Sequence, residues 1–155
     1  MIDVIDLKKT FGDLEVLKGI NVTINKGDIV VVIGPSGSGK STFLRCLNCM
    51  EDPTSGSIIF NGVDIADMRV DINIHRRHMG MVFQHFNLFN NMTVIENIMM
   101  APVYVRCKEL KKAKRKGTLA PDAPKTKAEI KAQAREEALE LLRRIGLEDK
   151  ACLLY

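Results

Sequence analysis

The stretch of sequence that decides the fold of this 155-residue chain is IVVVIGPSGSGKS, at residues 29–41. Residues 29–33 are continuous, apolar and mostly β-branched, and the turn-forming sequence NKGD precedes them. This pattern is typical of a strand buried on both faces, as in a parallel sheet that helices cover. Residues 34–39 then form a glycine-rich loop, and residues 40–50 are predicted to form a helix. A strand, a glycine-rich loop and a helix in this order predict an α/β domain.

The glycine-rich loop matches the pattern GxxxxGK[ST], in which each position has a role in binding phosphate. Gly34 lets the chain leave the strand sharply, while Gly37 and Gly39 permit positive φ angles that bring backbone N–H groups around phosphate oxygens. The following helix N-terminus also favours an anion. Lys40 is expected to reach the β- and γ-phosphates of a nucleotide, and the Ser41 hydroxyl is expected to bind Mg²⁺. The residues expected to contact the nucleotide here are Gly34, Pro35, Ser36, Gly37, Ser38, Gly39, Lys40, Ser41 and Thr42.

The positive charge of the chain is concentrated in one segment. The formal net charge is +4, but residues 106–127 contain nine Lys or Arg and two acidic residues. Gly117, Pro121 and Pro124 lie within this run, so we predict a flexible, solvated insertion over residues 106–127. Contact of its lysines with anionic lipid headgroups is the alternative. The rest of the chain is net acidic. We expect no nucleic acid partner.

Apolar runs and cysteines indicate the compartment. The most apolar stretches, at residues 29–34 and 98–105, are far shorter than the ~20 residues of a membrane-spanning helix. The N-terminus has no pattern of a secretory signal, so we expect the four cysteines to be reduced. Cys46 and Cys49 form a CxxC motif, for which a second metal-binding pair could come only from the HRRH sequence at residues 75–78. We interpret both cysteines as small apolar residues on a helix.

The remaining elements follow from shorter patterns. Apolar, partly alternating sequences predict strands at residues 2–7, 15–24, 57–60 and 80–83. Residues 93–100 are predicted to be helical, and residues 64–78 fit no clear pattern. A capping box of Thr126 and Glu129 begins an amphipathic helix that stops at Gly146. The apolar positions of this helix are Ile130, Ala134, Ala138, Leu141, Leu142 and Ile145.

Features outside the glycine-rich loop resemble the ATPase subunits of ATP-binding-cassette (ABC) transporters. Upstream, TFG at residues 10–12, followed by Val16, is similar to the aromatic loop of that family. The resemblance implies that Phe11 stacks on adenine, where the family more often has Tyr, and that Val16 packs beside it. Downstream, MVFQ at residues 81–84 is similar to the family's Q-loop. The resemblance implies that Gln84 contacts Mg²⁺ or the attacking water and links the nucleotide state to the membrane partner.

Two further segments resemble a subgroup of that family. LRCLN at residues 44–48 and EDPTSG at residues 51–56 look most like the subunits that energise uptake of polar amino acids. The resemblance implies a P-loop NTPase core of an ABC ATPase domain, with N-terminal antiparallel strands and part of the helical subdomain. It also implies ATP and Mg²⁺ as cofactors, Lys40 and Gln84 as catalytic residues, and Ser41 and Gln84 as metal ligands.

The resemblance also implies partners and a location. The expected partners are membrane permease subunits, reached through the region after Gln84, a second ATPase subunit in a homodimer and, indirectly, an extracytoplasmic solute-binding protein. The subunit would lie peripherally on the cytoplasmic face of the cell membrane, without a transmembrane segment.

The resemblance covers residues 1–155 but only the N-terminal portion of the family's single ATPase domain. The sequence contains no LSGGQ-type signature, no four apolar residues followed by Asp-Glu (the Walker B pattern), and no switch histidine after them. We therefore expect a truncated, N-terminal fragment, because those parts supply the catalytic Glu and the clamp from the opposing subunit. The alternatives are a nucleotide-binding remnant or regulatory module without turnover, and a non-transport ABC ATPase.

Overall fold

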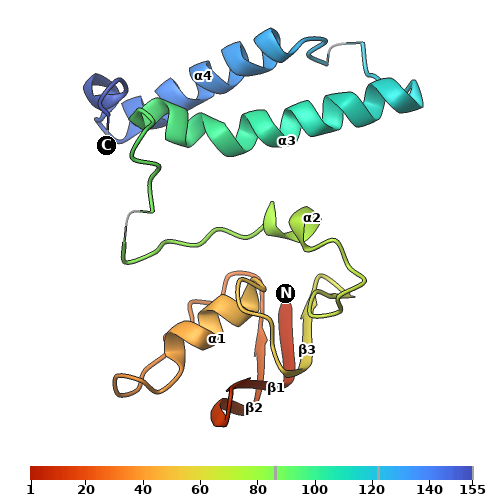
Figure 1. Cartoon of the computed structure of the whole chain (residues 1–155), viewed down its shortest axis with the longest axis vertical. Coiled ribbons are helices and arrows are strands. Elements are labelled where there is room, and N and C mark those ends of the chain that lie inside the picture. Colours follow the sequence, from red (N-terminus) through yellow and green to blue (C-terminus); the bar gives the residue numbers. More distant parts are fainter. Residues whose placement is uncertain (86, 122, 155) are drawn as a thin grey trace. The chain divides into compact units, whose positions relative to one another are not determined.

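The computed structural model describes residues 1–85, 87–121 and 123–154, which fall into two compact units. The first unit is Met1–Val82 and the second is Phe83–Tyr155. Strands and the glycine-rich loop belong to the first unit, and the two long helices belong to the second (Figure 1). Each unit has its own packed cluster of apolar side chains.

The first unit is built on an antiparallel sheet with the strand order β2-β1-β3-β4. β1 (Ile2–Phe11) and β2 (Leu14–Ile24) form a hairpin in which Phe11 pairs with Leu14. β3 (Ser55–Phe60) pairs with the other edge of β1, and the short β4 (Val63–Asp64) pairs with β3. The predicted strands at residues 2–7, 15–24 and 57–60 are therefore confirmed, each with a small extension.

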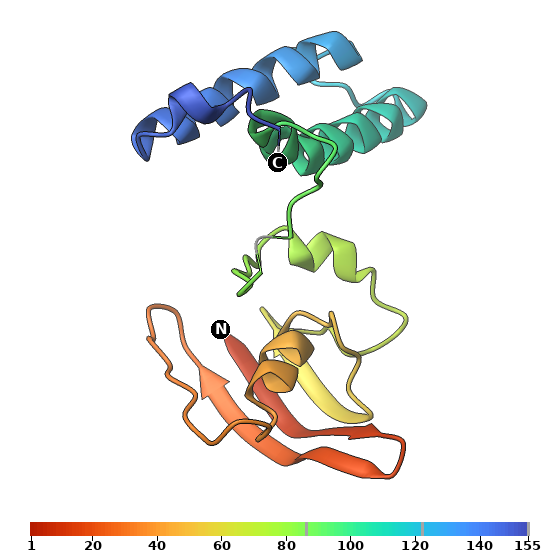
Figure 2. The same cartoon turned by 60° about the vertical axis from the view of Figure 1, so that its left-hand side comes forward.

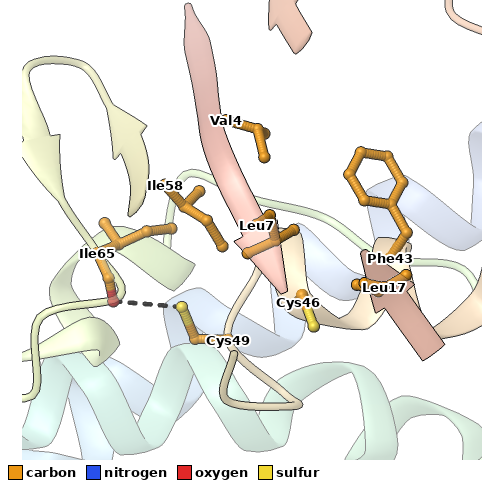
Figure 3. Packing of buried hydrophobic residues seen from close by; sticks show 8 residues of the cluster. All are labelled: Val4, Leu7, Leu17, Phe43, Cys46, Cys49, Ile58 and Ile65. Carbon is orange, nitrogen blue, oxygen red and sulfur yellow. Dashed lines mark hydrogen bonds between the residues drawn. The ribbon is translucent and has the colours of Figure 1, made fainter. Parts of the chain in front are cut away.

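One helix covers a face of this sheet. α1 (Lys40–Leu47) buries Phe43 and Cys46 against the strands, and it ends three residues before the predicted end of the helix. Burial of a side chain as large as Phe43 contributes roughly 1.5–3 kcal/mol to the free energy of unfolding. Figure 3 shows the cluster that results, which consists of Val4, Leu7, Leu17, Phe43, Cys46, Cys49, Ile58 and Ile65.

Cys46 and Cys49 are buried in this cluster as free thiols, as apolar residues at the end of α1 would be. The Cys49 thiol donates a hydrogen bond to the carbonyl oxygen of Ile65 at 3.2 Å, drawn as a dashed line in Figure 3. Desolvation by burial raises the pKa of Cys46 and raises the pKa of Cys49 to about 11. Both residues are therefore protonated at neutral pH.

α2 (Ile72–Arg76) lies in the segment whose sequence fits no pattern. The Asp71 side chain caps its N-terminus by accepting a hydrogen bond from the backbone N–H of Asn73. The guanidinium of Arg76 donates to the carbonyl oxygens of Asn48 (3.1 Å) and Cys49, which follow the last turn of α1. A cation at a helix C-terminus is favoured by the helix dipole, so this tertiary contact stabilises the end of α1.

The predicted strands at residues 29–33 and 80–83 are wrong. Neither segment forms a strand, and the side chains of Ile29, Ile33 and Val82 are 94%, 88% and 99% exposed. A strand buried on both faces needs neighbouring strands to take up its N–H and C=O groups and layers to cover its faces. The sheet in the described residues is antiparallel throughout and offers residues 29–33 no partner.

The second unit is a pair of long helices that run back along each other (Figures 1 and 2). α3 (Val94–Lys116) and α4 (Lys127–Arg144) are followed by a short 3₁₀ helix, η1 (Glu148–Lys150). Ile95 of α3 packs with Ala138 and Leu142 of α4 and with Ala151. The backbone N–H of Ile95 also donates to the carbonyl oxygen of Ala151 at 3.0 Å, so the end of the unit is fastened to the start of α3.

Both long helices begin with a threonine cap. Thr93 and Glu96 form a complete capping box at α3, where helix was predicted. Thr126 caps α4 by accepting from the N–H of Glu129, while the Glu129 carboxylate accepts from the N–H of Lys125. The predicted start of α4 is thus confirmed, with the return hydrogen bond shifted by one residue. Of the predicted apolar stripe of α4, Ile130, Ala134, Ala138 and Leu142 are buried, whereas Leu141 and Ile145 are exposed.

The predicted flexible insertion at residues 106–127 is wrong for its first half. Residues 106–116 form the C-terminal half of α3, which continues through Pro102 and ends at Gly117, where φ is 65°. Lys, Arg, Glu and Leu are good helix formers, so the charged composition of this half supports a helix as well as a solvated loop. Residues 117–121 and 123–126 connect α3 to α4, and Asp122 lies outside the described residues.

Candidate nucleotide-binding site

The glycine-rich loop forms the entrance to α1. Gly37 and Gly39 have φ angles of 79° and 87°, so the positive φ predicted at both positions is confirmed. The backbone N–H of Ser38 donates to the carbonyl oxygen of Pro35 at 3.3 Å, which closes the loop into a turn. Gly39 is the N-cap residue of α1, and the chain enters the helix directly from its left-handed conformation.

The N-terminus of α1 is open to an anion. Gly39 has no side chain with which to cap the helix, and α1 carries no acidic residue in its first turn. The first N–H groups of a helix have no partner within it and carry part of its positive dipole. By contrast, α3 and α4 are both capped by threonine and glutamate side chains. The residues of the loop therefore fit a phosphate group.

β2 sets the position of the loop. A Cβ atom added to Gly39 would lie 3.0 Å from Cγ1 of Val16 and 3.2 Å from Cδ2 of Leu17. Since Leu17 is buried in the core cluster, the close approach of Gly39 fixes the end of the loop against the sheet. Val16 thus lies against the glycine-rich loop, and its predicted packing beside adenine stays a prediction.

The Lys40 ammonium is turned back into the loop. Its Nζ donates to the carbonyl oxygens of Gly34 (2.8 Å) and Pro35 (2.6 Å) and to Oγ of Ser38 (3.4 Å). These acceptors hold a positive charge within the curve of the loop. Ser41, on the first turn of α1, is exposed, and Thr42 beside it is half-buried. The hydroxyl of Ser41 is thus accessible to a metal ion.

Phe11 ends β1 at the tip of the β1–β2 hairpin, and its side chain is 46% exposed. Through the hairpin it shares a sheet with Val16, although its predicted stacking on adenine stays a prediction. Lys9 is a neighbour that the sequence reasoning missed. Its Nζ lies 4.8 Å from the centroid of the Phe11 ring, forms an ion pair with Glu51 at 2.7 Å and donates to the carbonyl oxygen of Asp52 at 2.7 Å. The signal was available, because residues two apart on a strand share one face.

Gln84 belongs to the second unit, whereas the loop belongs to the first. Gln84 is exposed, and its predicted roles at Mg²⁺ and the attacking water stay predictions. Within the described residues, no cluster of three or more His, Cys, Asp and Glu side chains could hold a metal ion. None of the helices in those residues is long and apolar enough to cross a membrane.

Comparison with known proteins gives the family. The sequence pattern of the ABC transporter family matches residues 17–153. The chain is 47% identical over 150 residues to the arginine transport ATP-binding protein ArtM of Bacillus subtilis, a match that covers 97% of this chain and 54% of that protein. It is 44% identical over 146 residues to the glutamine transport ATP-binding protein GlnQ of Geobacillus stearothermophilus, covering 94% of this chain and 51% of that protein.

The fold is similar to that of solved ABC cassettes. One similar structure is a dimeric structure of a bacterial ABC transporter cassette. The match covers 98% of this chain and 85% of the cassette chain, with a TM-score of 0.60 and 25% sequence identity. The chain spans about half the length of the curated relatives it matches. The open N-terminus of α1, the glycine-rich loop before it and the match over residues 17–153 agree, and the chain belongs to the ABC transporter family.

Proposed function

We propose that this chain is the nucleotide-binding part of an ABC-type ATPase subunit that energises import of polar amino acids. The observation that carries the proposal is the uncapped N-terminus of α1, which follows a loop with Lys40 folded into its curve. The substrate class is supported by similarity to proteins whose names specify transport of glutamine, arginine and histidine/lysine/arginine/ornithine.

Different residues of the loop would bind different parts of Mg-ATP. The nucleotide supplies the phosphoryl group that is transferred to water. Backbone N–H groups of the loop and of the first turn of α1 bind phosphate oxygens, since they point out of the helix end. The Lys40 ammonium exchanges its carbonyl acceptors for phosphate oxygens and neutralises their charge. Ser41 offers its hydroxyl to Mg²⁺, and Gln84 offers its carboxamide to the ion or to the attacking water.

The rest of the proposal concerns assembly. Phe11 offers an exposed ring face for adenine, with Val16 beside it. The subunit works as a homodimer on the cytoplasmic face of the membrane and contacts permease subunits through the region after Gln84. A solute-binding protein delivers the amino acid to the permease and meets this subunit only indirectly. Dimerisation is supported by the dimeric state of the similar cassette.

A fluorescent ATP analogue titrated into the 155-residue chain tests the nucleotide site. We expect saturable, Mg²⁺-dependent binding that Lys40→Ala weakens by at least tenfold, because the ammonium lies in the loop. Lys18→Ala, which removes an exposed lysine of β2 outside the loop, is the matched control and should bind as the parent chain does. Equal binding by the Lys40 variant would show that the loop is not the site.

A second candidate is a nucleotide-binding module without turnover. It is favoured by the absence of an LSGGQ-type signature and of an apolar run ending in Asp-Glu from the 155 residues. Measuring phosphate release at saturating Mg-ATP separates the two candidates. ATP affinity without phosphate release supports the module for this chain, whereas release that Lys40→Ala abolishes supports the ATPase.

A further inference from the structure

The second unit contains a groove of about 740 Å³ between α3 and α4. Its floor comes from α3 and is apolar, with Met99, Met100, Val103 and Tyr104 at helical spacing along one stripe. Tyr104 is 68% exposed, while the two methionines are half-buried. Flexible methionines and an amphipathic tyrosine suit contact with an irregular apolar layer that has a polar edge.

The rim of the groove is basic on both sides. Lys108 and Lys111 continue the stripe of α3, and Lys127, Lys131 and Arg135 recur every four residues along the facing side of α4. All five side chains are exposed. Lysine and arginine can lay their methylene stems on apolar surface while their charges reach outward, so this rim can border the floor without covering it.

Among the described residues that line the groove, one acidic side chain offsets only part of the charge of this rim. Glu96, the acidic residue at the groove, accepts hydrogen bonds from the backbone N–H and the hydroxyl of Thr93, both at 2.9 Å. These hydrogen bonds and, to a smaller extent, the charge of Lys131 lower the pKa of Glu96, so Glu96 offsets one of the five basic side chains of the rim. Elsewhere in the described residues of this unit, ion pairs join Arg106 to Glu137, Arg143 to Glu140 and Glu148, and Lys150 to Asp149.

We propose that this face of the α3–α4 pair docks on an anionic lipid surface. Headgroup phosphates bind among the lysines and arginine of the rim, and the apolar edge of the lipid layer rests on the floor. Charge complementarity favours a surface over an acidic peptide, because exposed Arg115, one turn beyond Lys111 on the same stripe, extends the positive charge along α3 past the end of the groove. A peptide in the groove would leave this charge unused, whereas a lipid surface engages it together with the rim.

The proposal goes beyond nucleotide binding, since every residue named for it lies in the second unit and none belongs to the glycine-rich loop. The test uses the 155-residue chain without nucleotide and sedimentation with vesicles of phosphatidylcholine, alone or with 30% phosphatidylglycerol. We expect binding to the anionic vesicles only. Vesicle binding and ATP binding are measured separately, so failure of one proposal is distinguishable from failure of the other.

Two triple variants localise the contact. Each basic residue at an anionic surface strengthens partitioning about fivefold, so neutralising Lys108, Lys111 and Lys131 to Gln should weaken it roughly 100-fold. The matched control replaces Lys18, Lys26 and Arg144 by Gln, which removes the same charge from exposed residues that do not line the groove. Circular dichroism of both variants checks that they retain their helices. Equal loss in the two variants would overturn the proposal, because it would reflect net charge alone.

Cysteine labelling gives an independent measure of which face touches the lipid. Cys107 lies half-buried in the groove, and Cys152 is exposed outside it. We expect anionic vesicles to slow maleimide labelling of Cys107 and to leave Cys152 unaffected. Vesicle binding without protection of Cys107 would overturn docking through the groove. So would absence of vesicle binding together with protection of Cys107 by a Glu-rich amphipathic peptide, which would identify a peptide site instead.

Discussion

Substitution of Gly39 by alanine tests whether contact with β2 sets the phosphate-binding loop. Gly37 supplies a matched control, because both glycines have φ near +80° but only Gly39 has close neighbours. An added Cβ at Gly37 meets nothing within 4 Å, whereas at Gly39 it would lie 3.0 Å from Val16 and 3.2 Å from Leu17. Comparing the two alanine variants therefore separates the cost of the backbone conformation from the cost of the contact.

The expected magnitudes follow from these two costs. Alanine in the left-handed region costs about 1–2 kcal/mol, partly offset by about 0.4–1 kcal/mol because alanine restricts the unfolded chain. Gly37→Ala should therefore lower the stability of the loop by about 1 kcal/mol. Gly39→Ala adds an overpacking cost of about 1–3 kcal/mol, because Leu17 belongs to the buried cluster and cannot move freely. We expect a total of about 2–4 kcal/mol for Gly39→Ala.

Hydrogen exchange at the backbone amide of Phe43 measures this effect locally, because that N–H donates to the carbonyl oxygen of Gly39 at 2.8 Å. Each 1.4 kcal/mol of lost stability speeds exchange about tenfold. Gly39→Ala should exchange about 10 to 100 times faster than Gly37→Ala and should bind the ATP analogue more weakly. Equal exchange rates in the two variants would refute the inference that β2 positions the loop.

Three further outcomes are expected. Arg76→Ala should lower stability by about 1.5–3 kcal/mol in chemical unfolding, because its charged hydrogen bonds to the carbonyls after α1 are lost, and Arg76→Lys should restore only part of this. Hydrogen bonds from Arg69 hold the pKa of Asp67 at about 2. The contribution of the ionised Asp67 carboxylate to stability is therefore present above pH 4 and lost as pH falls toward 2. Arg69→Gln should return the pKa of Asp67 toward 3.8 in an NMR titration. Burial raises the pKa of Cys49 to about 11, so stability should fall as pH rises from 9 to 11, and Cys49→Ala should flatten this dependence in melting curves.

The conformation of the glycine-rich loop could be predicted because its determinants are local. The positive φ at Gly37 and Gly39 and the start of α1 at Lys40 depend on residues next to one another in the sequence. The contact between Gly39 and Val16 is not local, and no spacing in the sequence specifies it. α2 illustrates the same limit, since its Arg76 finds its acceptors 27 and 28 residues earlier in the chain.

The basic segment shows how composition leaves two structures open. The sequence predicts Gly117 within a flexible loop, whereas in the structure Gly117 ends α3. The preceding residues 106–116 lack β-branched side chains and proline, which is compatible with a helix. Because these residues are helical, Lys108 and Lys111 lie on one stripe of α3 beside the lysines of α4, and their positive charges gather at one groove.

The exposed segment at residues 29–33 does not weaken the candidate site, because other contacts hold the loop. Its apolar composition was correctly recognised, but a strand requires partner backbone that the described sheet does not provide. The C-terminal end of the loop does not depend on residues 29–33, since Gly39 packs on Val16 and Leu17 of β2. Phe43 and Cys46 of α1 are buried in the same core cluster as Leu17. The direction of the α1 N-terminus is thus set by the antiparallel sheet. We therefore expect phosphate binding by this chain to depend on the β1–β2 hairpin and α1 rather than on pairing of residues 29–33.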